Sequence, residues 1–233
     1  MTTIDAHNPH APQPANASSP GWQRYEAAPH WRHAADEFDA CKLGFWLFLA
    51  TEVLLFAGLF CAYAMFRLLY PDAFAAGAHH LDVRWGGLNT VVLLVSSFTV
   101  AMSIRNAQLN QTKWLRINLV ITILCAFIFF FIKLAFEYIP KWSHGIRPGV
   151  LYANPFPAHP QEHIWWSVYY CATGIHALHV LIGAALLAWC LYRSLRSNAY
   201  GPTHYTMLEN AGLYWHLVDL IWIFLFPLLY LIH

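Results

Sequence analysis

Six ionisable side chains lie inside long apolar stretches of the sequence, where water cannot solvate a charge. They are Glu52, Lys133, His176, His179, His216 and Asp219. An ionisable group at the centre of a membrane helix costs about 2.5–3.5 kcal/mol on insertion scales, so it needs a partner or a task. Such groups can relay protons, ligate a metal or haem, or tie helices together by hydrogen bonds.

Glu52 lies about nine residues into its apolar stretch, roughly 13 Å from the nearer end at the rise of an α-helix. Its neighbours on the same helix are apolar, namely Phe48, Leu49, Leu55 and Phe56. A hydrogen-bond partner must therefore come from another helix or from trapped water. Taken alone, this residue leaves structural and functional roles equally open.

His176 and His179 are three residues apart and share one face of a helix. Imidazole is the commonest metal ligand, so a metal or haem site is one interpretation. Two axial haem ligands must lie at the same depth, but His179 lies about 20 Å from the inner boundary and His216 only about 6 Å. We therefore interpret the histidines as buried hydrogen-bonding groups. His179, within about 6 Å of Glu52 in depth, is a candidate partner of that carboxylate.

Two further pairs have the spacing of neighbours on one helix face. His216 and Asp219 are three residues apart, so a histidine–carboxylate hydrogen bond would partly satisfy both. Lys133 and Glu137 are four apart, which predicts a structural ion pair, although the lysine could also extend to the interface. Glu209 lies at the edge of a span, near the interface.

Five apolar segments carry these residues, and each is long enough to cross a hydrocarbon core about 30 Å thick as a helix. They comprise residues 43–66, 87–104, 117–136, 164–192 and 212–232. None alternates like a strand of a membrane barrel, and all are longer than such strands. Because only helices or closed barrels satisfy the backbone in lipid, the sequence predicts an all-α integral membrane protein, a bundle of five transmembrane helices.

The composition agrees with a membrane protein. Hydrophobic residues make up 58% of the chain and charged residues 11%, against about 45–50% and about 25% in soluble domains. The net charge of +1 offers no basic footprint for nucleic acid. The five cysteines form no C-x-x-C pair, so neither a disulfide framework nor a thiolate metal site is expected.

Residues 1–41 differ in composition, and we expect a polar, partly disordered tail ahead of a membrane domain at 42–233. Met1–Pro20 is rich in Pro, Ala, Asn, Ser and Thr and has no apolar run that could form a signal-peptide core. The tail histidines could bind metal, but we interpret them as solvated: His7, His10, His30 and His33. Eight basic residues on the N-terminal side against four on the other favour a cytoplasmic N-terminus and a periplasmic C-terminus.

Tyr170–Gly183 (YCATGIHALHVLIG) contains a Thr-Gly pair followed by two histidines three residues apart. It is close to the T-G-x-H-x-x-H-V-x-x-G signature of subunit III of the haem-copper oxidases, of the cytochrome c oxidase type, and is the most specific of several stretches that resemble this family. The others are similar to a Y-W-H-F-V-D-x-x-W signature, a glutamate-bearing helix, an L-N-T…S-S helix and a K-x-x-x-E-Y helix end: Tyr214–Phe224, Lys42–Phe60, Leu88–Thr99 and Lys133–Tyr138. Longer family members have seven spans, of which this chain is expected to hold the last five. Five-span members of the family occur among bacterial oxidases, so the resemblance implies a bacterial inner membrane.

The resemblance implies an accessory subunit with no catalytic residue, no metal and no redox cofactor of its own. The haems and copper would belong to oxidase subunits I and II, with cytochrome c as electron donor and dioxygen reduced to water. Subunit III would stabilise subunit I and support proton uptake, with Glu52 at the position of the family's buried carboxylate. Membrane lipids are implied partners, and a bound phospholipid is compatible with the family, although the lipid cleft of seven-span members is incomplete here.

Two alternatives stay open from the sequence. The nearer one keeps the fold and changes the donor or acceptor, giving a subunit of a quinol oxidase or an accessory protein of nitric-oxide reductase. The more distant one is a proton-coupled transporter, since an intramembrane glutamate with histidines fits a proton relay. Against the transporter, the five spans show no internal repeat of the kind that many transporters carry.

Overall fold

The computed structural model describes residues 34–155 and 157–231. Within them, five helical spans are long and apolar enough to cross a membrane, so the expected all-α bundle is confirmed. The long helices are α1 (Ala34–Leu69), α3 (Val83–Gln108), α4 (Thr112–Ile132), α6 (Glu162–Ser197) and α7 (Thr206–Tyr230). A π-helix, η2 (Lys133–Tyr138), and the short α5 (Ile139–Ser143) extend the span of α4. The chain is a multi-pass membrane protein.

Local signals fix where the helices begin and end. α2 (Pro71–Ala78) starts with a proline, whose fixed φ suits the first helical position. Asp82 caps α3 by accepting a hydrogen bond of 2.9 Å from the backbone N–H of Arg84. A single 3₁₀ turn, η3 (Gly149–Leu151), lies between α5 and α6. Asn198 ends α6 in the left-handed conformation, with φ 46°.

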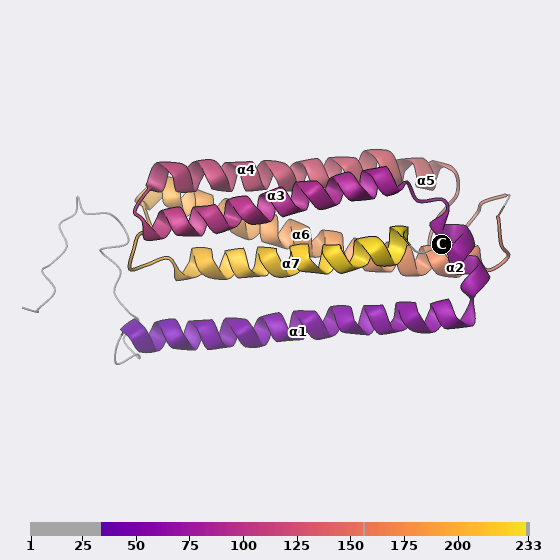
Figure 1. The fold of residues 1–233 in the computed structure, drawn as a ribbon, viewed down its shortest axis with the longest axis horizontal. Helices are drawn as coiled ribbons and strands as arrows, with labels where there is room; N and C mark the ends of the chain where they lie inside the picture. The colour runs from indigo at the N-terminus through magenta and orange to yellow at the C-terminus, as the bar shows by residue number, and fades with distance from the viewer. Residues whose placement is uncertain (1–33, 156, 232–233) are drawn as a thin grey trace, which may run out of the picture.

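The helices form one bundle in which α1 is the least embedded (Figure 1). α3 and α4 lie side by side, α7 runs between α3 and α1, and α6 lies behind α3 and α7. Within its most apolar stretch, α7 buries 50% of its residues, whereas α1 buries 11%. α7 is therefore the central helix, and most of α1 faces the surroundings.

Small residues let α7 approach its neighbours closely. A Cβ atom at Gly183 of α6 would lie 2.9 Å from the ring of Trp215, so a larger residue does not fit without a shift. Trp215 is 1% exposed and donates its indole N–H to the hydroxyl of Ser96 on α3 at 3.0 Å. Close backbones and interhelical hydrogen bonds of this kind hold helices together in lipid, where the hydrophobic drive is absent.

The observed boundaries differ from the expected ones in every span. α3 and α7 begin four and six residues before the expected 87 and 212, at Val83 and Thr206. α1 begins at Ala34, inside the stretch expected to be a polar tail, and its first turn carries acidic residues that favour a helix N-terminus. The third span runs on to Ser143, and the fourth covers Glu162–Ser197. The tail histidines lie outside the described residues: His7, His10, His30 and His33. The side of the membrane on which each terminus lies stays a prediction.

Candidate functional site

Glu52 on α1 and His179 on α6 share a hydrogen bond, with Glu52 Oε2 2.8 Å from His179 Nε2. The other ring nitrogen, Nδ1, lies 2.7 Å from the carbonyl oxygen of Ile175, to which only an N–H can donate. The contact with Glu52 must therefore contain a proton of its own. Either a protonated Glu52 donates to Nε2, or an imidazolium donates to the carboxylate. The pair can hold one transferable proton inside the membrane.

Aromatic rings surround the Glu52–His179 pair. Phe56 of α1 meets the His179 ring edge-on, with centroids 5.1 Å apart, and Tyr214 of α7 stacks on it at 6.4 Å. The side chain of Glu52 is 16% exposed and that of His179 is 10% exposed. Low local dielectric strengthens such a hydrogen bond and makes its loss costly. The pair therefore attaches the most exposed helix to the bundle.

His176 lies one turn earlier on α6 but has different neighbours. It is fully buried between Phe129 of α4 and Trp222 of α7, with ring centroids 5.8 and 5.1 Å away. Neither of its ring nitrogens has a hydrogen-bond partner among the described residues. The structure thus does not bring His176 and His179 into one site. In the part of the chain that is described, no group of three or more His, Cys, Asp or Glu side chains could hold a metal ion.

His216 of α7 pairs with Ser97 of α3 rather than with Asp219. His216 Nδ1 lies 2.6 Å from Ser97 Oγ. Asp219 is 3% exposed, and its Oδ1 has no partner among the described residues. Spacing along α7 could not reveal this hydrogen bond, because the Ser97 hydroxyl comes from another helix.

Lys133 and Glu137 form an ion pair at η2, and two tyrosines complete it. Lys133 Nζ bonds Glu137 and also lies 3.1 and 2.7 Å from the hydroxyls of Tyr169 and Tyr230. Both tyrosines donate to the Glu137 carboxylate. Lys133 and Glu137 are 2% and 1% exposed, so the ammonium does not extend to the interface. This η2 cluster joins the extended α4 span to α6 and α7.

Glu209, near the start of α7, pairs with Lys42 of α1, whose Nζ lies 3.2 Å from Glu209 Oε1. The side chains of Lys42 and Glu209 are exposed by 36% and 22%. Exposed ion pairs are weak because water and salt screen them. This pair is a second, weaker attachment of α1 to the bundle.

Comparison of the sequence with known proteins assigns the chain to a family. The family model described as Cytochrome c oxidase subunit III matches residues 23–233. This chain belongs to the cytochrome c oxidase subunit III family. The resemblance noted in the sequence is thereby confirmed, and membership implies an oxidase complex.

Individual members of the subunit III family match over most of their length. Cytochrome c oxidase subunit 3 of Thermostichus vulcanus is 32% identical over 200 residues, which cover 86% of this chain and 91% of the relative. The Corynebacterium diphtheriae subunit is 31% identical over 208 residues, covering 88% and 95%. The Tetraodon nigroviridis subunit is 32% identical over 197 residues, covering 81% and 68%.

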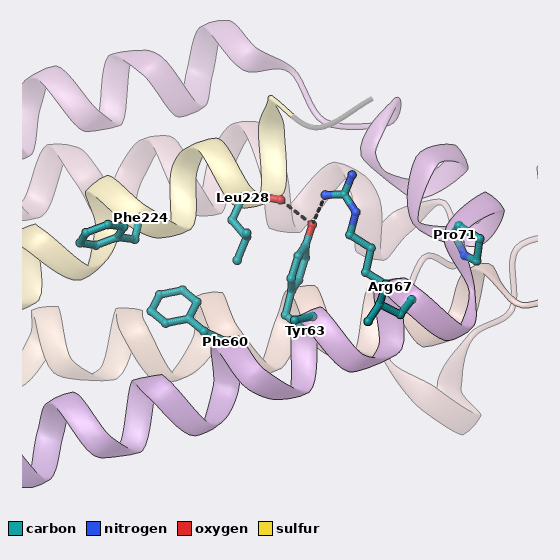
Figure 2. Close-up of a pocket in the computed structure, with 8 residues that line it drawn as sticks. Phe60, Tyr63, Arg67, Pro71, Phe224 and Leu228 are labelled. Atoms are coloured by element: carbon teal, nitrogen blue, oxygen red, sulfur yellow. Dashed lines mark hydrogen bonds between the residues drawn. The ribbon is translucent and has the colours of Figure 1, made fainter.

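A cavity of about 780 Å³ opens between α1 and α7 of this subunit III family member. Figure 2 shows apolar side chains along it, including Phe60, Phe224 and Leu228. At one end, the Tyr63 hydroxyl donates to the carbonyl oxygen of Leu228 at 2.6 Å, and Arg67 donates to that hydroxyl at 3.3 Å (Figure 2). An apolar groove that ends in a guanidinium has the chemistry to hold an acyl chain and a phosphate.

Proposed function

We propose that this chain is the accessory subunit III of a proton-pumping haem-copper terminal oxidase, which reduces dioxygen to water. The family match over residues 23–233 supports this proposal. In it, the haems and copper lie in oxidase subunits I and II, cytochrome c supplies electrons, and this chain contributes no catalytic residue. The proposed location is a bacterial inner membrane, with the N-terminus in the cytoplasm.

The Glu52–His179 hydrogen bond is the observation that carries the proposed role. It joins the glutamate-bearing helix Lys42–Phe60 to the histidine signature Tyr170–Gly183, and it crosses from α1 to α6. The shared proton can rest on Glu52 or on His179, and its release would leave two acceptors facing each other, so the charge of the pair and the strength of this contact are coupled. We infer that the pair retains α1 and stores a proton near the uptake path of subunit I.

The remaining buried polar groups favour structural work over catalysis. His216 bonds Ser97 of the neighbouring helix, and Lys133 and Glu137 bond each other. A catalytic group has to reach a substrate, whereas the polar side chains of the η2 cluster hydrogen-bond one another. The described residues therefore support a structural subunit that packs beside the redox-active subunits.

We further infer that the groove between α1 and α7 holds a phospholipid. Its apolar walls suit an acyl chain, and Arg67 at its end suits a phosphate. Mass spectrometry of the complex in mild detergent should find a lipid retained by the wild-type chain. Arg67→Ala should lower its occupancy. Unchanged occupancy would place the lipid elsewhere on the complex.

Isolation of the chain with its partners tests the proposed function. We expect an affinity-tagged chain, purified in mild detergent, to bring haem-bearing polypeptides and a copper-binding second subunit. A second subunit without a Cys/His copper cluster would indicate a quinol oxidase instead. A colourless chain isolated alone would contradict the proposal and favour a transporter. Haem or copper bound to the lone chain would also contradict it.

A further inference from the structure

The loop between α5 and α6 presents two apolar side chains to its surroundings. We define this interfacial loop as residues 145–153, and it lies at the same end of the bundle as α2 (Figure 1). Val150 is 101% exposed and Leu151, beside it in η3, is 54% exposed. Val150 is the most exposed large hydrophobic residue in the described part of the chain. Adjacent apolar side chains left open in this way indicate an interaction surface.

Hydrogen bonds to α6 hold the interfacial loop in place. The backbone N–H of Gly149 donates to Ser167 Oγ at 2.8 Å. The hydroxyl of Tyr170 donates to the carbonyl oxygen of Ile146 at 3.0 Å. The apolar tip of the loop is therefore held out by contacts on both sides of Arg147 and Pro148.

The same contacts give the depth of the loop in the membrane. Ser167 and Tyr170 lie about 8 and 12 Å along α6 from its first residue. The loop therefore folds back beside the fourth span instead of extending beyond it. Tyr170 also meets Trp142, near the end of the third span, edge-on at 6.3 Å. Because Trp and Tyr are enriched where hydrocarbon meets water, the loop lies at the height of that boundary.

A cation lies beside the apolar tip. The guanidinium of Arg147 lies 5.3 Å from the centroid of the Trp142 ring. Arg147 forms no ion pair with another described residue, and its buried Nε has no hydrogen-bond partner among them. A guanidinium binds phosphate with a planar pair of N–H donors, and lipid phosphates lie at the same boundary. The loop thus combines an apolar tip with a charge complementary to a lipid headgroup.

We propose that the interfacial loop is a membrane anchor, in which Val150 and Leu151 enter the leaflet at the α2 end of the bundle and Arg147 binds a lipid phosphate. Anchors of this kind bind more strongly as they bury more apolar area and as the lipid becomes more anionic. Trp142, which is 46% exposed within the third span, joins the loop to the membrane-facing surface of the bundle. The anchor therefore continues a lipid interface that the spans already form. It requires only the membrane spans and does not depend on the proposed function.

An anchor on this loop gives α6 a fixed height in the membrane. α6 has 36 residues and is about 54 Å long, whereas a hydrocarbon core is about 30 Å thick. Its length alone is therefore compatible with several heights. Because the loop is bonded to Ser167 and Tyr170, its insertion selects one of them, and with it the depth of His179.

Photo-crosslinking in native membranes tests the anchor in the full chain. We expect a crosslinking residue at Val150 to give an adduct heavier than the chain by one phospholipid. Gln161 is the matched control, because it is exposed at the start of α6, about 9 Å before Ser167 along the helix, and should give little or none. Capture of another polypeptide from Val150, or equal capture of lipid from both positions, would overturn the inference.

Spin labels in lipid vesicles measure the depth of the loop directly. The label is placed at Val150→Cys or Gln161→Cys in a chain whose three exposed cysteines are replaced by serine, namely Cys41, Cys61 and Cys171. In phosphatidylcholine vesicles, the label at 150 should collide more often with oxygen, which dissolves in hydrocarbon, than with a water-soluble nickel chelate. The label at 161 should show the reverse. Equal access of the chelate to both labels would overturn the anchor.

The contribution of Arg147 is tested in the same vesicles. Adding phosphatidylglycerol, which is anionic, should move the label at 150 deeper, because it strengthens the attraction of the guanidinium to the headgroups. Arg147→Gln should abolish this shift and leave the label at 161 unchanged. A shift that persists in Arg147→Gln would contradict the phosphate contact.

Discussion

The η2 cluster and α1 are held to the bundle by opposite means. In the η2 cluster, Lys133, Glu137, Tyr169 and Tyr230 bond one another in one fully buried group. α1 is attached by contacts spread along its length, through Lys42, Glu52 and Tyr63. A concentrated network fails as a unit, whereas separated contacts fail one at a time. The bundle therefore has a core held by one cooperative cluster, whereas α1 can lose its contacts to the bundle one at a time.

The largest effect should come from breaking the η2 cluster. Glu137→Leu leaves the Lys133 ammonium buried without a counter-charge, and we expect a loss of about 3–5 kcal/mol in the free energy of unfolding. Unfolding of the purified protein in a denaturing detergent would measure it. The double variant Lys133→Met/Glu137→Leu removes both charges and should lose much less. A single variant as stable as wild type would show that the cluster is not a structural unit.

Breaking the Glu52–His179 hydrogen bond should have an intermediate effect. Glu52→Ala leaves His179 Nε2 without its partner, and a hydrogen bond to a charged group contributes about 1.5–3 kcal/mol. We expect α1 to detach more readily and the complex to lose activity sooner during sustained turnover. The haem spectrum should not change, because the pair holds no cofactor. Thr51→Ala, one residue away, should behave as wild type; a changed spectrum in Glu52→Ala would contradict the proposed role.

The Lys42–Glu209 pair should matter less. Its side chains are exposed by 36% and 22%, and exposed pairs contribute about 0.2–1 kcal/mol. Lys42→Gln should therefore lower stability slightly at low salt. At high salt, where screening weakens the wild-type pair, the two proteins should converge. A difference that grows with salt would rule out an electrostatic attachment.

The smallest effect should come from His204, in the loop between α6 and α7. Burial, and then the nearby charge of Arg193, hold the pKa of His204 below its ordinary value of 6.5, against the opposing charge of Glu37. The unfolded chain therefore takes up a proton more readily. This contribution to stability is present above about pH 6.5 and is lost as the pH falls through the folded-state pKa. The melting temperature of His204→Gln should fall less than that of wild type between about pH 7.5 and pH 5.5, and an identical fall would contradict the prediction.

Hydropathy and depth predicted much of this molecule. Each span needed only a long apolar run, and Glu52 could be matched to His179 because helix rise gives depth directly. Lys133 and Glu137 could be paired because their spacing lies on one helix. Contacts that follow from a single helix, or from depth alone, are therefore accessible to sequence reasoning.

Contacts that depend on the rotation of one helix against another were not accessible. Ser97 forms a hydrogen bond with His216 because α3 is rotated so that the Ser97 hydroxyl faces α7. Nothing in the sequence fixes that rotation of α3. Tyr169 and Tyr230 complete the η2 cluster from two other helices. The π-helix itself adds a residue to one turn, which periodicity at 3.6 residues does not predict.

The dispersed origin of the η2 cluster has a consequence for biogenesis. Lys133 and Glu137 enter the membrane with the extended α4, and Tyr169 follows with α6, but Tyr230 arrives only with α7. Until the ribosome has delivered α7, the growing polypeptide carries a half-satisfied ion pair in lipid. We expect translation arrested before α7 to release a nascent chain that membrane proteases and chaperones recognise as immature.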